Sequence, residues 1–335
     1  MSVNTQHPEY AKHYPKWVMM RDALNDEVIK KGTVYLSKTP GMLALDREGL
    51  DPEQNVYCGY KNRAQYPLWV ADSVRTMNGL LTRLNPEVDL VHKQLEILKT
   101  QATDDGFGLD QCFIRCCVEA LGKGRYGLLV DFDDKGQPYI SMYDSLSIIN
   151  WKLSDVGGRR DAKLVVLQES HLKENQNKYS HDSEELYREL ELVDNQYEVR
   201  LLNESGKEVE SFEPKMGTKR LNFIPFVFGG SLDNSPEIDD IPLYSMAKCA
   251  VKYYQLSADY YQSLYLTAHP QPYTIGADNV DLKVSGPMML WVLPQGASCG
   301  FMEIQGNGIE KTKAEMDSQK TAAVEAGANV LDAGS

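Results

Sequence analysis

The stretch that decides the fold reads Phe223-Ile224-Pro225-Phe226-Val227-Phe228, then Gly229-Gly230-Ser231, and then an acidic turn. After that turn, no Gly or Pro occurs from Leu243 to His269. Asp239 or Asp240 can cap a helix here, and Pro242 stands where a first-turn proline belongs. At 1.5 Å per residue such a helix is about 40 Å long. The pattern predicts a strand over 223–228, a glycine break, and a continuous helix over 242–268.

Apolar and small side chains recur along this helix every three or four residues, as in a near-heptad seam. Six of them are expected to pack the helix: Leu243, Ala247, Ala250, Tyr254, Tyr261 and Leu264. Tyrosines also lie on the other faces, and ionisable groups are scarce. Because a helix that is apolar on several sides needs neighbours on several sides, we expect packing between subunits.

The rest of the chain mixes helical and strand-like patterns. Helices are expected at 15–31, from about 57, at 68–81 and at 109–121, with an irregular piece over 32–55. A hairpin is expected from strands 126–132 and 138–143, and further strands at 163–169, 187–193 and 197–202. Helices and strands in this order predict an α+β fold rather than a doubly wound sheet.

The chain beyond Pro270 contains several glycines and prolines and reads as irregular. A piece from Gly276 to Met289 is followed by an expected strand over 288–293 and an expected helix over 308–330. The apolar stripe of that helix is thin. Such a stripe predicts packing against something outside this chain, or a missing continuation.

Length and charge narrow the class of protein. A chain of 335 residues holds one large or two to three ordinary domains. The formal net charge of −13 argues against a protein that grips phosphates tightly, because Lys and Arg contacts dominate nucleic-acid affinity. A conduit of like charge would still let DNA slide, although ordinary solubility charge is the simpler interpretation of composition alone. No run of 18 apolar residues occurs, so we expect no contact with a membrane.

The expected strands beyond 161 carry many acidic residues. Between His181 and Pro214 there are eleven Asp or Glu and three Lys or Arg. A solvated outer face of a small sheet is the favoured interpretation. A partner surface in a ring assembly is the other one.

One glycine pattern resembles a nucleotide-binding fingerprint. Residues 122–127 read Gly-Lys-Gly-Arg-Tyr-Gly, which fits G-x-G-x-x-G. That fingerprint requires a strand before the glycines and a helix after them, so that the helix N-terminus holds the phosphates. Here the expected helix comes first and the strand second. A helix C-cap followed by a strand is therefore the favoured interpretation.

Other reactive residues do not combine into a catalytic or metal-binding motif. Cys112, Cys116 and Cys117 fall on one expected helix, with no C-x-x-C pair or nearby His, so packing is favoured over zinc. Asp131, Asp133 and Asp134 suit a hairpin turn better than a cation loop. We expect no enzyme, no catalytic residue, no metal and no cofactor. The alternative is a soluble α+β enzyme with a cleft near 122–151.

Several motifs, taken in their order, resemble one known family. The first consists of Tyr60, Arg63-Ala64 and Tyr66, followed by Val74 and residues 77–81, and is similar to "RA-x-Y…T-x-x-G-L". The second, residues 124–131, is similar to "G-R-x-G-x-L-V-D". The others are Ile148-Ile149-Asn150-Trp151, the 223–228 strand with its long helix, and Leu293-Pro294-Gln295-Gly296-Ala297. Together they span most of residues 57–328. The chain resembles the portal proteins of tailed bacteriophages, which form the head-to-tail connector.

The resemblance implies an architecture. Residues 1–150 would be the N-terminal wing region of α/β character, and 151–232 a β-rich stem and clip region. Residues 233–270 would hold the long stem helix. The last part, 271–335, would hold a tunnel-loop segment, returning wing strands and the start of a C-terminal helix on the crown side. The whole would assemble into a ring, by resemblance a dodecamer.

The resemblance also implies partners and a place of action. The ring would sit at the capsid vertex of the virion after assembly in the host cytoplasm, and double-stranded DNA would pass through it without sequence specificity during packaging and ejection. Terminase, adaptor and tail proteins, capsid and scaffolding proteins would contact it, the adaptors through the acidic lobe at about 163–229. Portals place a tunnel loop after the stem helix, so Asn279, Lys283 and Ser285 would face the DNA.

Overall fold

The structure is a computed structural model that describes residues 2–83, 87–133, 136–154, 161–173, 179, 181–268, 271–276, 295–302 and 306–332. Its helices and antiparallel sheets confirm the α+β fold class. The chain forms two compact units. Unit 1 comprises Met1–Glu27, Leu68–Ala247 and Ala326–Ser335, and unit 2 comprises Val28–Pro67 and Lys248–Glu325. The boundary expected at 150/151 falls inside a strand of unit 1.

The first helix of unit 1, α1 (Pro8–Leu24), begins earlier than the sequence suggested. The prediction of 15–31 was wrong because Pro15 lies inside the helix and does not open it. Pro8 occupies the first turn instead, and the His7 ring accepts a hydrogen bond from the Glu9 N–H at 3.2 Å. Deep burial of the Trp17 side chain, whose Nε1 donates to the Lys123 carbonyl at 3.0 Å, offsets the missing N–H of Pro15.

Helix α5 (Leu109–Lys123) covers one face of a three-stranded antiparallel sheet in the order β10-β1-β2. Two further helical segments complete this side of unit 1: α4 (Trp69–Arg83) and the 3-10 helix η2 (Lys93–Lys99). The strands are β1 (Arg125–Phe132), β2 (Pro138–Asp144) and β10 (Phe226–Gly230). The expected hairpin over 126–143 is confirmed.

Strand β10 is shifted from the predicted 223–228. Gly229 and Gly230 do not break the strand but pair with Tyr126 and Arg125. A Cβ atom at Gly229 would collide with the Tyr126 ring, so glycine is needed there for close packing across the sheet. The expected break therefore follows the glycines instead of including them.

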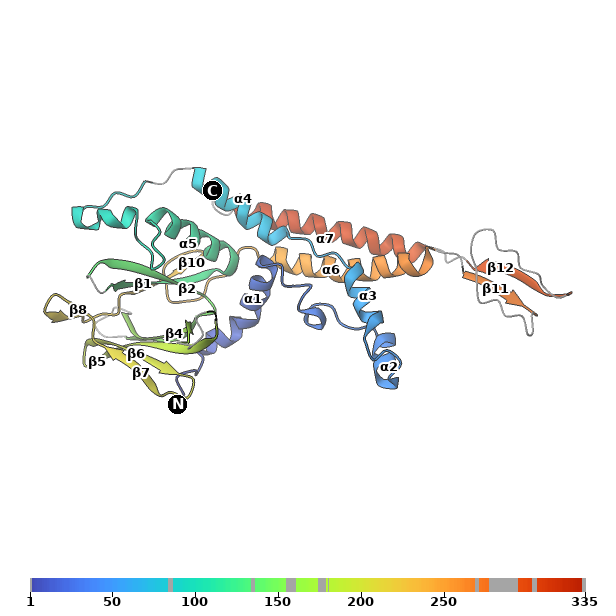
Figure 1. The fold of residues 1–335 in the computed structure, drawn as a ribbon. Coiled ribbons are helices and arrows are strands. Elements are labelled where there is room, and N and C mark those ends of the chain that lie inside the picture. The colour runs from blue at the N-terminus through green and yellow to red at the C-terminus, as the bar shows by residue number, and fades with distance from the viewer. Residues whose placement is uncertain are drawn as a thin grey trace. The chain divides into compact units, whose positions relative to one another are not determined.

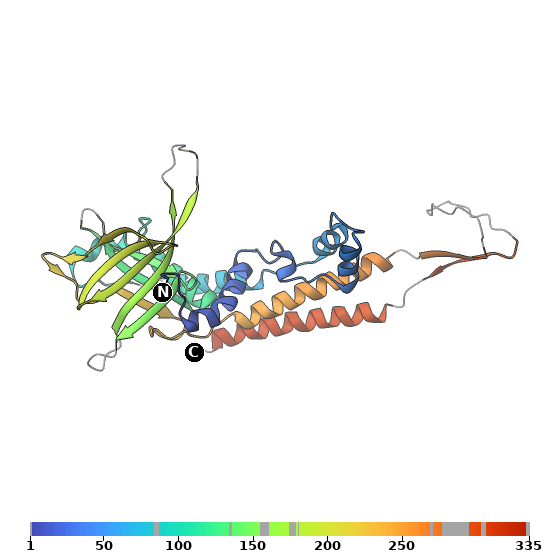
Figure 2. The ribbon, with the colours of Figure 1, turned by 90° about the horizontal axis from the view of Figure 1, so that it is seen from below.

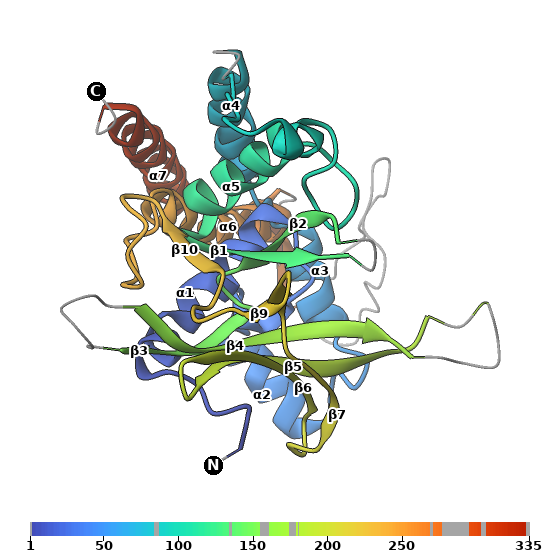
Figure 3. The same cartoon turned by 90° about the vertical axis from the view of Figure 1, so that its left-hand side faces the viewer.

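The other face of this sheet packs against a five-stranded antiparallel sheet in the order β3-β4-β5-β6-β7 (Figures 1 and 3). Its strands are β3 (Ile148–Ser154), β4 (Asp161–Leu172), β5 (Ser183–Val193), β6 (Gln196–Asn203) and β7 (Glu208–Phe212). A short hairpin, β8 (Lys215–Met216) and β9 (Lys219–Arg220), leads back to β10. Unit 1 is thus a layer of helices on two stacked sheets.

Unit 2 is built around the long helix α6 (Tyr244–Thr267), which starts in unit 1. The predicted continuous helix over 242–268 is confirmed to within two residues at each end. The smaller helical elements of unit 2 are η1 (Gly32–Val34), α2 (Pro40–Glu48) and α3 (Asn55–Arg63). The expectation of an irregular 32–55 was wrong because Thr39 caps α2, Pro40 opens it and Gly49, at φ +66°, ends it.

The chain returns along α6 as helix α7 (Asn307–Asp332), shown beside it in Figure 2. Two residues of its thin apolar stripe, Met316 and Ala323, are buried inside this chain at 5% and 2% exposed, whereas Val324 is 65% exposed. The stripe therefore packs in part within this chain, and further packing outside it, or a missing continuation, stays a prediction. Between the two helices, β11 (Gln271–Ile275) pairs antiparallel with β12 (Ser298–Met302).

Candidate functional site

Three of the motifs that carry the resemblance meet at one side chain. Arg125 of β1 lies with its guanidinium carbon 4.2 Å from the Trp151 ring centroid and 4.7 Å from that of Phe228. Trp151 belongs to β3 and Phe228 to β10, and the two rings are 6.2 Å apart. His7 stacks on Trp151 at 3.9 Å. We call these four residues the aromatic cluster.

The Arg125 guanidinium also holds the loop that leads to α6. Its Nη1 donates hydrogen bonds to the carbonyl oxygens of Pro236 at 2.8 Å and of Glu237 at 3.3 Å. Arg125 is 1% exposed, and its Nε and Nη2 have no hydrogen-bond partner among the described residues. Burial lowers the pKa of Arg125 to about 10, while the charge of Asp239 acts in the opposite sense. The guanidinium thus stays charged at neutral pH.

The neighbouring glycine pattern is structural, as the order of helix and strand suggested. Gly124 adopts φ +69° and ends α5, and its N–H donates to the carbonyl oxygens of Glu119 and Ala120. A Cβ at Gly124 would lie 2.8 Å from the Asp240 carbonyl oxygen. The end of α5 that faces the glycines is its C-terminus, which repels phosphate. The C-cap interpretation of 122–127 is confirmed.

Helix α6 buries most of its predicted packing residues within the chain. Leu243, Ala247, Ala250 and Tyr254 are all fully buried. Tyr261 is half-buried and its hydroxyl donates to the Gln65 side chain at 3.2 Å, whereas Leu264 is 36% exposed. Apolar exposure then rises at the end of the helix, where Tyr265 is 60% and Leu266 55% exposed. Packing between subunits along α6 stays a prediction.

The "RA-x-Y" motif of unit 2 binds the same helix. Arg63 donates from Nε and Nη2 to the Gln262 side-chain oxygen at 3.1 and 2.7 Å, and its guanidinium lies 4.1 Å from the Tyr265 ring centroid. Tyr60 donates to Asp259 at 2.6 Å. Ser257 of α6 joins the backbone N–H and carbonyl of Gln65. These contacts position the last three turns of α6.

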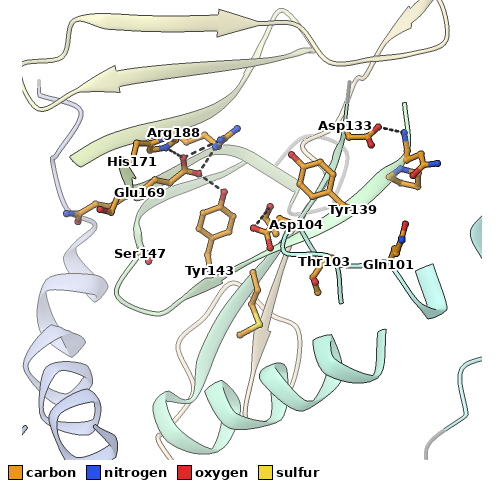
Figure 4. A pocket seen from close by; sticks show the side chains of 17 residues that line it. Gln101, Thr103, Asp104, Asp133, Tyr139, Tyr143, Ser147, Glu169, His171 and Arg188 are labelled. Carbon is orange, nitrogen blue, oxygen red and sulfur yellow. Dashed lines mark hydrogen bonds and ion pairs between the residues drawn. The ribbon is translucent and has the colours of Figure 1, made fainter. Parts of the chain in front are cut away.

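A pocket of about 640 Å³ opens between the two sheets near the end of η2 (Figure 4). It includes part of the cleft expected at 122–151 for an enzyme. Its carboxylates and hydroxyls come from several elements, and its most closely linked side chains are Tyr143, Glu169, His171 and Arg188.

Four ionisable side chains of this pocket are bound to one another. Glu169 accepts hydrogen bonds from the Tyr143 hydroxyl at 2.6 Å and from Arg188 Nε at 2.6 Å, and lies 2.7 Å from His171 Nε2. Arg188 also lies 3.9 Å from Asp131. Burial alone raises the pKa of Glu169, but the hydrogen bonds and charge of Arg188 outweigh it and the pKa lies below its usual value. We call these five residues the ionic cluster.

This arrangement joins the two sheets, and Glu169 is held within it. Tyr143 and Asp131 belong to the three-stranded sheet, while Glu169, His171 and Arg188 belong to the five-stranded one. A general base needs a lone pair directed at substrate, and the Glu169 oxygens already accept from three neighbours. Sequence reasoning missed this cluster, because nothing local in the sequence pairs strands β2, β4 and β5.

The expected tunnel residues Asn279, Lys283 and Ser285 lie outside the described residues, as does the expected strand over 288–293. The flanking residues form the β11–β12 ribbon, although the chain after Pro270 was expected to be irregular. That expectation failed because Pro272 lies in a two-stranded ribbon, where a missing N–H can face away from the partner strand. In the sequence, the expected tunnel residues therefore lie between two strands that pair with each other.

The six cysteines of the chain are free thiols, and Cys112 and Cys116 lie on α5. Within the described ranges, no group of three His, Cys, Asp or Glu side chains is arranged to hold a metal ion. No helix in the described part of the chain is long and apolar enough to cross a membrane.

Comparisons with known proteins give three results. A family model described as a domain of unknown function (DUF4055) matches residues 242–335, less than a third of the chain. No curated protein matches. Among solved structures, a chain from the virion of a native gene transfer agent (GTA) particle is similar with TM-score 0.39, and one from the neck of an empty GTA particle, computed with C6 symmetry, with TM-score 0.38.

Both structural matches are distant. Each has 13% sequence identity and covers 77% of this chain but 63% of the solved chain. This chain therefore spans less than two thirds of the length of the chains it matches. A likeness at this level supports no conclusion about function.

Proposed function

We propose that this chain is the structural portal protein of a bacteriophage-type virion. Copies of it would form a ring at the capsid vertex, through which double-stranded DNA is packaged and ejected. The chain would have no catalytic activity. Terminase would supply the energy for packaging, and adaptor, tail, capsid and scaffolding proteins would dock on the ring.

The aromatic cluster is the observation that carries this proposal. The stretches 124–131, 148–151 and 223–228 resemble portals separately and weakly in sequence, yet Arg125, Trp151 and Phe228 meet within 7 Å. Unrelated chance matches would have no reason to converge on one contact. The convergence supports treating the motifs as one inherited unit.

The long helix α6 and the charge of the chain support the same proposal. The C-terminal end of α6 leaves Tyr265 and Leu266 exposed, as a helix that contacts further copies would. A net charge of −13 suits a channel wall that repels DNA and lets it slide. The ionic cluster disfavours the enzyme alternative, because its hydrogen bonds are already satisfied.

Imaging of the purified protein tests the proposal directly. We expect end-on projections with countable subunits, and mass photometry at about twelve times 37.8 kDa, as for a closed ring with head-to-tail interfaces. A protein that stays monomeric or dimeric at micromolar concentration, and that turns over a small molecule, would support the enzyme instead.

Helix α6 offers a second test of ring assembly. Ala250→Pro should abolish rings, because an interior proline costs about 3 kcal/mol or more and kinks the helix at a fully buried position. Ala250→Gly, which keeps the N–H and costs about 1 kcal/mol, is the matched control and should still assemble. Rings at wild-type yield from the proline variant would refute a stem role for α6.

The tunnel segment carries the DNA part of the proposal. A ring would place one Lys283 per subunit in a girdle that contacts phosphates weakly. Lys283→Ala and Lys283→Glu should leave rings intact but lower packaged DNA, the second more than the first. Lys12→Glu, which changes the charge as Lys283→Glu does at an exposed position of α1, is the control. Normal packaging by both Lys283 variants would show that this residue has no role in packaging.

A further inference from the structure

Unit 1 presents two exposed surfaces of opposite charge. One is the outer strand β7, with Glu208, Val209 and Glu210, which we call the acidic edge. The other is the β8–β9 turn, with Lys215, Met216 and Lys219, which we call the basic hairpin. From β5 to the end of β7 acidic residues dominate, whereas the stretch 214–220 holds no acidic residue at all. The basic hairpin is thus a local exception in a chain of net charge −13.

The charges on both surfaces are unused within the chain. Among the described residues, Glu208, Glu210, Lys215 and Lys219 form no ion pair or side-chain hydrogen bond. Their neighbour Arg220 behaves differently, because it is tied back to Glu213 and Gln196. The two lysines are therefore left to interact with another molecule.

Each surface also has an exposed apolar side chain between its charges. Val209 is 59% exposed on the acidic edge, and Met216 is 68% exposed on the basic hairpin. Phe223, just beyond the hairpin, is 52% exposed. An apolar centre with a charged rim is the usual anatomy of a protein interface.

The two surfaces adjoin, because Glu208 of the acidic edge and Lys215 of the basic hairpin line the same groove. The hairpin projects beyond both sheets in Figures 1 and 2, whereas β7 forms the last strand of the five-stranded sheet. Different patches of one protein that fit each other can produce a head-to-tail interface, which forms a ring where the rotation between copies closes and an open filament where it does not. A patch that fitted itself would produce a two-fold dimer instead.

Backbone pairing does not explain how the acidic edge would be covered. β7 is bulged between the residues opposite Leu201 and Leu202, and an edge strand with a bulge and outward charges resists pairing with another strand. Contact through side chains remains, and a groove of about 520 Å³ lined by Glu198, Glu208 and Lys215 runs beside the strand.

We propose that the basic hairpin of one copy docks on the acidic edge of the next copy. The contact rests on the proposed function, since it specifies one interface of the ring. Lys215 and Lys219 lie against Glu208 and Glu210 of the neighbour, with Met216 and Val209 in the centre. Single exposed pairs contribute little, but the contact is repeated at every interface of a closed ring.

Charge reversal with rescue tests the contact. Glu208→Lys with Glu210→Lys (acidic-edge variant) and Lys215→Glu with Lys219→Glu (basic-hairpin variant) each place like charges together, and we expect at least a tenfold loss of rings at low salt. An equimolar mixture of the two variants should assemble again, because reversed edges meet reversed hairpins. The chain with all four changes should assemble alone.

A matched control separates contact from net charge. Lys152→Glu with Lys163→Glu changes the charge as the hairpin variant does, on exposed residues of β3 and β4 at the opposite side of the same sheet. This control should form rings normally. Circular dichroism and thermal unfolding of each variant show whether it is folded.

The outcomes distinguish the contact from the function. If the wild type forms rings and both reversed variants form them equally well, the contact is wrong and the portal proposal stands. If adaptor binding alone is lost, the acidic edge faces an adaptor and not a second copy. If the wild type forms no ring but a dimer that the reversals disrupt and the mixture restores, the contact stands and the portal proposal fails.

Discussion

Arg125 and Arg188 lie at the same interface between the two sheets of unit 1 but are stabilised in different ways. Arg125 is surrounded by rings and bonds only to backbone carbonyls. Arg188 bonds to the Glu169 carboxylate and lies near Asp131. Burial lowers the pKa of Arg125, while that of Arg188 is raised, since the hydrogen bond and charge of Glu169 outweigh burial.

The difference shows at which of the two arginines the stability of unit 1 depends on the charge of the side chain. Removing Arg125 leaves carbonyl groups without a donor, while the nearby Asp239 carboxylate keeps its hydrogen bond from the Leu232 N–H at 2.8 Å. Removing Arg188 leaves Glu169, whose side chain is 12% exposed, without its counter-ion. A buried charge that loses its partner is costly, whereas a buried charge replaced by an apolar group of similar size is often tolerated.

The same substitution at both sites gives the largest expected contrast. Arg188→Met should destabilise unit 1 by about 3–5 kcal/mol, the usual cost of breaking a buried pair. Arg125→Met should cost about 1–3 kcal/mol, the cost of buried carbonyls left without a donor. Urea unfolding followed by tryptophan fluorescence measures both. Equal losses at the two sites would remove the distinction between the clusters.

The two clusters also differ in how far the sequence could predict them. Arg125, Trp151 and Phe228 each stand in a stretch that the sequence marked by its resemblance, although their contact was not predicted. Glu169 and Arg188 stand in strands whose alternation was recognised, but their pairing depends on the register of β4 with β5. Register is set by the whole buried face of a sheet and cannot be read locally.

Local signals explain the successes and failures in the helices. The α6 prediction was close because no Gly or Pro interrupts the helix. The end of α5 was predicted because Gly124 adopts a left-handed conformation there. The start of α1 was missed because Pro15 resembles a first-turn proline, and only the burial of Trp17 and its bond to Lys123 show otherwise. The tunnel residues stay a prediction.

A smaller effect is expected at the edge of the ionic cluster. Tyr143→Phe removes one hydroxyl that donates to Glu169 at 2.6 Å, and should cost about 2 kcal/mol, as for a hydrogen bond to a charged group. Tyr10→Phe, which removes a hydroxyl that donates to the Leu146 carbonyl at 2.8 Å, is the neutral control and should cost about 1 kcal/mol. A larger loss at Tyr10 would contradict the charge-based ranking.

The ionic cluster should make stability depend on acid pH through Glu169. Because the pKa of Glu169 is lowered in the folded state, its contribution is complete above the unfolded value of about 4.3 and is lost as the pH falls through the folded value. The unfolding free energy of Glu169→Gln should therefore fall less steeply than that of the wild type below pH 5. Parallel curves would show that Glu169 has no special role.

The smallest expected effect lies on the aromatic side. His7→Ala removes the ring that stacks on Trp151 at 3.9 Å and accepts from the Glu9 N–H, and should cost about 1 kcal/mol. His7→Phe keeps the stack and loses only the cap, so its cost should be smaller. Neither variant should change the acid dependence assigned to Glu169, because no charge of the ionic cluster is altered. If His7→Phe were as harmful as His7→Ala, the cap and not the stack would be the contribution of His7, and the aromatic cluster would reduce to Arg125 between Trp151 and Phe228.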